Sequence, residues 1–213
     1  RSAGFDISLA GRKARFLVIE DFNTTGLDGS ISAPTNGGSN YYNFWWREGK
    51  SQKEGQSAGR WGLGKTVYHS CSHIRTFWGF TRRYDDGQEL LLGKTLLKSH
   101  LLNRKRFKYF GFYCHQGFRP IDDQKALQQF RSKFRLQRTT QPGLSLVIPM
   151  PVDEIDIDSL VKATVIHYFY PIIKGNLEVK FTDLDRGTDR SLSGDNLRKV
   201  ATAVNWDGTS WEQ

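Results

Sequence analysis

Ser57–Thr66 of this chain reads SAGRWGLGKT, and this stretch predicts how the rest of the chain is organised. Its glycines allow the backbone to turn N–H groups toward an anion. Lys65 adds a full positive charge, and the apolar residues from Val67 onward predict that a helix follows. The stretch is therefore interpreted as a phosphate-binding loop that leads into a helix.

One interpretation of this loop is the P-loop of a nucleoside triphosphatase. Gly59–Thr66 satisfies the pattern G-x-x-x-x-G-K-[ST], in which the lysine contacts phosphates and the hydroxyl contacts Mg²⁺. A P-loop follows a strand directly. The preceding residues Glu48–Ala58 (EGKSQKEGQSA) are instead polar and contain no β-branched run. The P-loop is therefore kept as the alternative interpretation.

A better strand lies upstream of the loop. Arg15–Asp21 (RFLVIED) is a short apolar run that ends in two acids, and the small-residue turn Phe22–Leu27 (FNTTGL) follows it. Asn23 within this turn tolerates the left-handed backbone angles that tight turns need. An acid at the end of a strand, before such a turn, is well placed to bind the base or ribose of a nucleotide.

Together, the acid and the later glycine loop resemble the ATP-binding site of the GHKL ATPases, the family of gyrase B, the heat-shock chaperones, the histidine kinases, MutL and the MORC proteins. The segment between the two motifs is most similar to the MORC, MutL and chaperone branch. The resemblance covers residues 5–182. It implies an α+β fold, a two-layer α/β sandwich of GHKL (Bergerat) type with a mixed, mostly antiparallel sheet. It also implies that residues 28–64 form a lid over ATP.

The resemblance implies a role for each matching position. Asp21 would bind the adenine amino group, and Ser145, within Gly143–Pro149 (GLSLVIP), would supply a hydroxyl beside it. The residues implied at the nucleotide are Asp21, Asn23, Thr24, Gly26, Gly59, Arg60, Trp61, Gly62, Leu63, Gly64, Lys65, Thr66 and Ser145. ATP and Mg²⁺ are the implied cofactors, and homodimerisation on ATP binding is an implied response.

One part of the family pattern, the N-box helix, is not present in this sequence. In the family this helix precedes the first strand and carries the asparagine that binds Mg²⁺ and the acid that activates water. We therefore assign no catalytic residue to this chain. ATP hydrolysis is expected if the full-length protein supplies the N-box.

The composition indicates one sizeable core, since the chain has 213 residues, 38% of them hydrophobic. No apolar stretch is long enough to span a membrane. Two cysteines are too few for a disulfide framework, so a cytoplasmic protein with no membrane partner is expected. Residues 1–182 are expected to form the ATP-binding domain. Residues 183–213 contain few apolar side chains and are expected to be an appendage or the start of a following region.

Positive charge is concentrated in the middle of the chain. The net charge is +9, and residues 94–138 contain twelve lysines and arginines against two acids. Such a region is typical of nucleic-acid binding, and also of a solvated surface or of lysines that meet ATP phosphates. A basic nucleic-acid-binding domain with exposed aromatic residues is therefore a further alternative.

Hydrophobic periodicity predicts the remaining elements. A strand at residues 5–9 is expected to form a hairpin with Arg15–Asp21. Further strands are expected at residues 76–82, 89–97, 107–115, 143–149 and 176–182, and helices at residues 67–77, 121–136 and 157–173.

Overall fold

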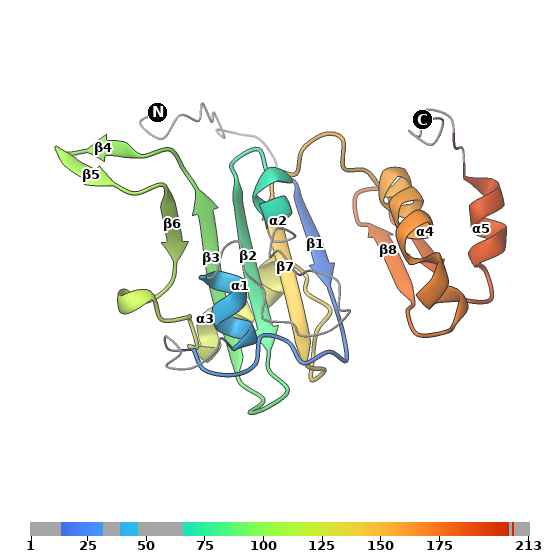
Figure 1. Cartoon of the computed structure of the whole chain (residues 1–213), viewed down its shortest axis with the longest axis horizontal. Helices are drawn as coiled ribbons and strands as arrows, with labels where there is room; N and C mark the ends of the chain where they lie inside the picture. Colours follow the sequence, from blue (N-terminus) through green and yellow to red (C-terminus); the bar gives the residue numbers. More distant parts are fainter. Residues whose placement is uncertain (1–13, 32–38, 47–65, 205, 207–213) are drawn as a thin grey trace. The chain divides into compact units, whose positions relative to one another are not determined.

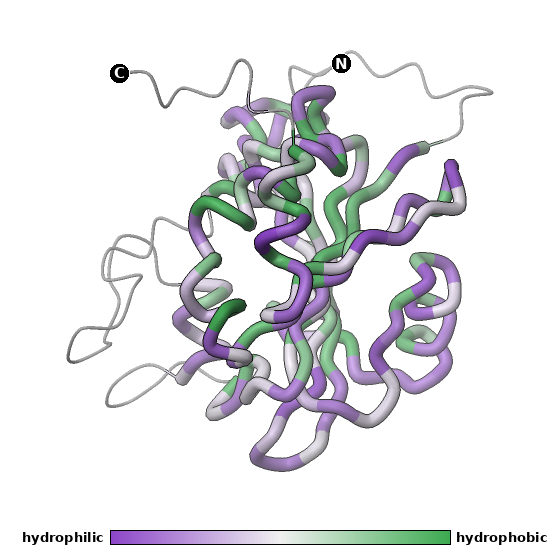
Figure 2. Tube along the Cα trace, turned by 90° about the vertical axis from the view of Figure 1, so that its right-hand side faces the viewer, coloured by the Kyte–Doolittle hydropathy of each residue, from purple (hydrophilic) through white to green (hydrophobic). Residues whose placement is uncertain are grey.

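The computed structural model of the chain describes residues 14–31, 39–46, 66–204 and 206 (Figure 1). These residues form an α+β protein that divides into two compact units, Arg1–Val152 and Asp153–Gln213. The strand expected at residues 5–9 lies outside the described residues. Hydrophobic residues are concentrated on the strands, and the connecting loops are mostly hydrophilic (Figure 2).

A five-stranded sheet forms the centre of the first unit, with the strand order β1-β7-β2-β3-β6 (Figure 1). Every described pair of neighbouring strands in it is antiparallel. In the pairing of β1 with β7, Phe16 lies opposite Pro149 and Glu20 lies opposite Ser145. The chain that leaves β1 therefore meets the start of β7. The strands are β1 (Phe16–Glu20), β7 (Gly143–Pro149), β2 (Thr76–Arg82), β3 (Glu89–Leu96) and β6 (Phe110–Tyr113).

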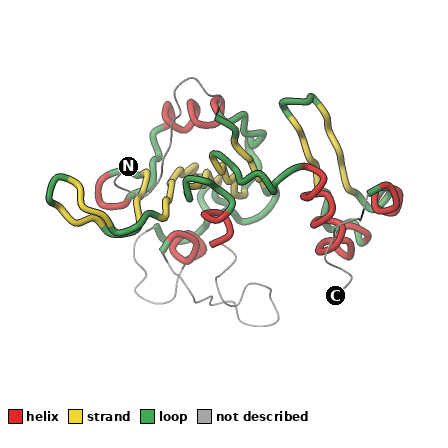
Figure 3. Tube along the Cα trace, turned by 90° about the horizontal axis from the view of Figure 1, so that it is seen from above, coloured by secondary structure: helices red, strands yellow, loops and turns green. Residues whose placement is uncertain are grey.

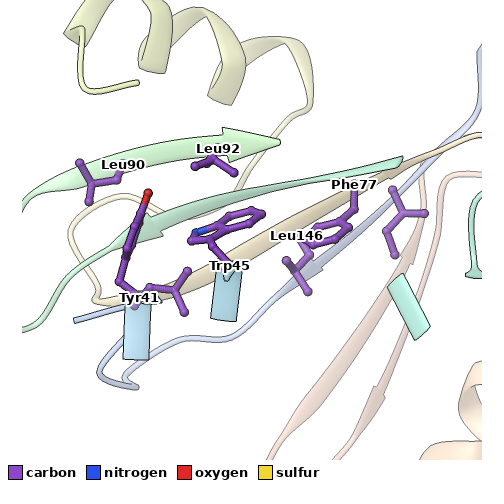
Figure 4. Packing of buried hydrophobic residues seen from close by; sticks show 8 residues of the cluster. Tyr41, Trp45, Phe77, Leu90, Leu92 and Leu146 are labelled. Carbon is purple, nitrogen blue, oxygen red and sulfur yellow. The ribbon is translucent and has the colours of Figure 1, made fainter. Parts of the chain in front are cut away.

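Two short helices, α1 (Asn40–Trp45) and α2 (Thr66–Ser70), pack on one face of this sheet, which we call the α1 face. Tyr41 and Trp45 are each 1% exposed and lie over the strands (Figure 4). Trp45 stacks on Phe77, with the ring centroids 5.5 Å apart. The close approach depends on Gly79, since a Cβ there would lie 2.9 Å from the Trp45 ring.

Helix α3 (Gln124–Lys133) covers the opposite face, which we call the α3 face (Figure 3). The side chain of Asp123 caps the helix by accepting a hydrogen bond from Ala126 N. Leu127 packs with Phe80 in a second core, separate from that under α1. The sequence predicted a two-layer sandwich, whereas the described sheet carries helices on both faces. The reason is that β2 and β3 are apolar at consecutive positions, so both of their faces need cover.

A small hairpin separates β3 from β6. It consists of β4 (His100–Leu102) and β5 (Lys105–Phe107) and forms its own two-stranded sheet. The sequence predicted one strand over residues 107–115. The structure instead ends β5 at Phe107 and begins β6 at Phe110, and a 3-10 turn, η1 (Gln116–Phe118), follows β6.

The second unit has a core of its own, which Val161, Val165, Ile172, Leu192 and Leu197 build. The sequence placed the boundary after residue 182 and read the remainder as an appendage. The structure divides the chain after Val152, because the side chains of Leu192 and Leu197 complete this core. The unit contains α4 (Ile157–Ile173), β8 (Val179–Asp183), β9 (Thr188–Leu192) and α5 (Leu197–Ala203).

Candidate functional site

The turn after β1 is anchored to two other strands. Asp21 N donates to Leu144 O at 3.0 Å, which ties the start of the turn to β7. Leu27 N donates to Thr81 Oγ1 at 2.9 Å, which ties the end of the turn to β2. The Thr81 hydroxyl donates in turn to Gly143 O at 3.0 Å. Three segments that are far apart in the sequence therefore fix the position of the turn.

Left-handed backbone angles give the turn its shape. Asn23 has a φ of 61°, a left-handed angle that asparagine tolerates, and donates from its N–H to Pro142 O at 3.0 Å. Gly26 has a φ of +65° and lies against β2. A Cβ on Gly26 would lie 2.6 Å from Arg82 O and 2.8 Å from Thr81 Oγ1. Glycine is thus required at position 26 by both the backbone angle and the space.

The Asp21 carboxylate is held through one of its oxygens. Its Oδ1 accepts hydrogen bonds from Leu144 N at 2.5 Å and from Thr24 Oγ1 at 3.1 Å. No described residue donates to Oδ2, and the side chain is 52% exposed. Asp21 directly follows the last residue of β1. The second carboxylate oxygen of this half-exposed side chain is therefore available to a ligand.

A buried arginine lies behind this turn. Arg138 is 1% exposed, and its Nη2 donates to Asp21 O and lies 3.7 Å from Asp21 Oδ1. Its Nε donates to Ser145 Oγ at 3.0 Å. Burial lowers the pKa of Arg138, while the carboxylates of Asp21 and Glu20 act in the opposite direction. The guanidinium thus fixes the backbone of the strand end and offsets the negative charge of two acids.

The Ser145 hydroxyl donates to Glu20 and not to the Asp21 carboxylate. The side chain is fully buried, and the distance from its hydroxyl to Glu20 Oε1 is 2.7 Å. Since Ser145 is directly opposite Glu20 in the sheet, it shares the α3 face with that residue, and Leu144 occupies the side of Asp21. The structure therefore corrects the position implied for Ser145, which supports the strand end from behind.

Thr66, the last residue of the predicted glycine loop, begins α2 on the α1 face. Tyr68 of this helix lies 6.2 Å from Phe44, measured between ring centroids. The helix is shorter than the one predicted at residues 67–77, and its end is linked to the far end of β7, where Val152 N donates to Cys71 O at 3.0 Å. The Asp21 turn lies at the opposite end of β7. The other implied loop residues lie outside the described part of the chain: Gly59, Arg60, Trp61, Gly62, Leu63, Gly64 and Lys65.

A second polar cluster, on the α3 face, was not predicted. Glu89 accepts hydrogen bonds from Arg82 and Arg131, each with a shortest distance of 3.1 Å. Arg131 Nη2 also donates to Arg138 O at 3.1 Å, which links the cluster to the arginine behind Asp21. A cavity of about 400 Å³ adjoins it, lined by Glu89, Gln124, Gln128, Arg131, Ser132, Arg135, Leu136 and Gln137. The sequence signal for this cluster was Glu89, a charged residue that begins the apolar strand β3.

Two further findings concern metal ions and membranes. Among the residues that the structure describes, no group of three or more His, Cys, Asp and Glu side chains is arranged to hold a metal ion. None of the described helices has the length and apolar character needed to cross a membrane. No family model, curated protein or solved structure matches this chain, so the functional argument rests on the fold and on the geometry around Asp21.

Proposed function

We propose that this protein binds ATP at the Asp21 turn, in a site of the GHKL type. The observation that carries the proposal is the arrangement of the Asp21 carboxylate, whose Oδ1 is held by Leu144 N and Thr24. Its Oδ2 can accept a hydrogen bond from the adenine amino group. Guanine presents a carbonyl oxygen at the corresponding position, which a carboxylate repels. The site should therefore select adenine over guanine.

Some of the other residues of the proposed site give the turn its shape, and the rest are implied by the family resemblance alone. Asn23, Thr24 and Gly26 fix the turn, and Ser145 supports it through Glu20 and Arg138. Contacts of residues 59–66 with the phosphates follow from the resemblance, as does a lid at residues 28–64. Within that segment α1 packs into the core of the α1 face through Tyr41 and Trp45, so any closure would have to come from the other residues of the segment. Mg²⁺, hydrolysis with a supplied N-box and dimerisation on ATP binding remain predictions on the same basis. The cytoplasmic location remains a prediction from the low cysteine content.

The topology favours this proposal over a P-loop. P-loop nucleotide sites belong to strand–loop–helix units in parallel sheets. In the described sheet each pairing is antiparallel, and the helix after the loop, α2, has only five residues. A P-loop enzyme would also depend on Lys65 more than on Asp21.

Calorimetric titration of the protein with ATP, ADP and GTP in the presence of Mg²⁺ tests the proposal, with Asp21→Asn as the main variant. Asparagine keeps a side-chain oxygen for Leu144 N and Thr24, so the turn should hold. Its NH₂ group then faces the adenine amino group, and two donors meet. We expect ATP binding to weaken about ten- to hundredfold, the equivalent of losing a hydrogen bond to a charged group.

Asp122→Asn is the matched control, because it makes the same change at a side chain that is 74% exposed. It should leave ATP binding unchanged. Binding of ATP and GTP with equal affinity, retained in Asp21→Asn and lost in Lys65→Ala, would contradict the proposal and favour the P-loop. The absence of any nucleotide binding would also contradict it.

A second candidate function, nucleic-acid binding through residues 94–138, is supported in only part of that region. Lys94 is 5% exposed and donates to Trp45 O at 3.2 Å. Arg138 is buried, and Arg131 is bonded to Glu89. The cations that remain exposed and close together lie at residues 98–108. Binding of a polyanion at these residues is the second candidate.

A further inference from the structure

The hairpin of β4 and β5 carries cations that no acid neutralises. Residues 98–108 contain no acidic side chain. Within the described part of the chain, none of their lysines and arginines takes part in an ion pair, whereas Arg82 of β2, Arg83 just after it and Arg131 of α3 all do. The exposed cations of this segment are Lys98, Arg104, Lys105, Arg106 and Lys108.

The hairpin is a defined two-stranded ribbon. Leu102 pairs with Lys105, so the loop has two residues, Asn103 and Arg104, with φ values of 50° and 62°. Two positive φ angles are the signature of a type I′ turn, whose twist matches that of the strands. The rings of His100 and Phe107 stack across the strands at 5.6 Å. The cations are thus presented on an ordered scaffold.

The charges lie on both faces of the ribbon and at its tip. Lys105 shares a face with Phe107, and Arg106 shares the other face with Leu101, because side chains alternate along a strand. Arg104 lies in the turn. A flat anionic surface, or a single nucleic-acid strand, would contact only one face of the ribbon. Phosphates on two sides at once are found in the groove of a duplex.

We propose that this hairpin binds double-stranded DNA by entering the major groove, with its cations against the phosphates of the two strands. The major groove of B-form DNA admits a two-stranded β-ribbon. The corresponding groove of duplex RNA is too narrow for side chains to read. The inference rests on the second candidate function and is independent of the adenine site.

Fluorescence anisotropy of the whole chain with a short labelled DNA duplex, without nucleotide, tests the proposal. The variant is Lys105→Gln/Arg106→Gln/Lys108→Gln, and the control is Arg119→Gln/Lys125→Gln/Lys133→Gln. The control removes the same charge from exposed positions outside the hairpin. We expect the hairpin variant to bind about ten- to hundredfold more weakly, and its salt slope to fall by up to about 2.7, since each lost phosphate contact contributes about 0.9. The control should bind within about twofold of wild type.

Competition with unlabelled single-stranded DNA, duplex RNA and anionic vesicles completes the test. The proposal is overturned if the hairpin variant binds the duplex as wild type does, if the control weakens binding equally, or if any competitor displaces the duplex as well as unlabelled duplex does. Binding that needs the hairpin but is shared equally by single-stranded DNA, duplex RNA or vesicles would overturn the inference and leave the second candidate function standing, whereas binding that does not need the hairpin would overturn both. No binding to any nucleic acid would overturn both. Unchanged circular dichroism of the variants shows that they are folded.

Discussion

Gly26 is the residue on which the shape of the Asp21 turn depends. Its φ is +65°, and an added Cβ would lie 2.6 Å from Arg82 O. Gly87 has nearly the same φ, +69°, but no atom within 4 Å of its added Cβ. Alanine at either position would have to adopt the left-handed backbone conformation, which lowers the stability of the folded state by about 1–2 kcal/mol. Gly26→Ala adds a steric overlap, which costs a further 1–3 kcal/mol or so.

We therefore expect Gly26→Ala to lower the free energy of unfolding by more than Gly87→Ala does, in urea titrations of both variants. Gly26→Ala should also weaken ATP binding, because the turn that carries Asp21 has to move. Gly87→Ala should bind ATP as wild type does. Equal destabilisation by the two substitutions would show that space at position 26 is not limiting.

The residues around Asp21 also show what a single sequence can predict. The strand that precedes Asp21 follows from local composition, and so does the tolerance of Asn23 for the left-handed angle that it adopts. The residues that hold the end of this strand do not follow from local composition, since Arg138 and Ser145 belong to segments that are distant in the sequence. A shift of one position in the register exchanges the two faces of a strand. The role of Ser145 therefore depended on a pairing with Glu20 that no local pattern encodes.

Among the elements, those defined by an uninterrupted apolar pattern were predicted best. β2, β7 and α4 have the predicted bounds, and Pro171 lies within the last turn of α4. The helix predicted at residues 67–77 was wrong beyond Ser70, because Phe77 belongs to β2 and contributes to the sheet core. The β4–β5 hairpin was missed, since its turn residues Asn103 and Arg104 include no glycine.

The turn between β2 and β3 contains Asp85, whose contribution to the stability of the fold depends on pH. Asp85 accepts hydrogen bonds from Arg83 Nη2 at 2.8 Å and from Gly29 N at 2.9 Å, which ties the start of the predicted lid to the sheet. The Arg83 hydrogen bond is the main cause that lowers the pKa of Asp85 from its ordinary value of 3.8 to about 2. Because the folded state has the lower pKa, the stabilisation is present above pH 3.8 and is lost as the pH falls toward 2.

Urea unfolding of wild type and Asp85→Asn at about pH 5 and about pH 2.5 measures this contribution. Asparagine does not titrate, so the variant should lose less stability than wild type between the two conditions. The side chain of Asp85 is 39% exposed, so solvent screening should keep the difference below about 1 kcal/mol. An identical loss of stability in both proteins would show that the Arg83–Asp85 contact does not stabilise the fold.

At the scale of the whole molecule, the chain has two units with separate cores. Leu146 is 4% exposed in the core of the α1 face, and Leu192 is 1% exposed in the core of the second unit. The sequence did not reveal this division, because the apolar side chains of residues 183–204 are few and widely spaced. Because the two cores are separate, we expect a substitution in one core to destabilise only the unit that contains it.

Hydrogen exchange of the full chain, read by mass spectrometry, tests this with Leu192→Ala and Leu146→Ala as a matched pair. Each substitution should cost about 2–5 kcal/mol in its own core. Leu192→Ala should speed exchange in α4, β8, β9 and α5 and leave β1, β7, β2 and β3 protected as in wild type, and Leu146→Ala should do the reverse. Faster exchange throughout the chain in either variant would mean that the units unfold as one. Retained ATP binding in Leu192→Ala would in turn assign the proposed adenine site to the first unit alone.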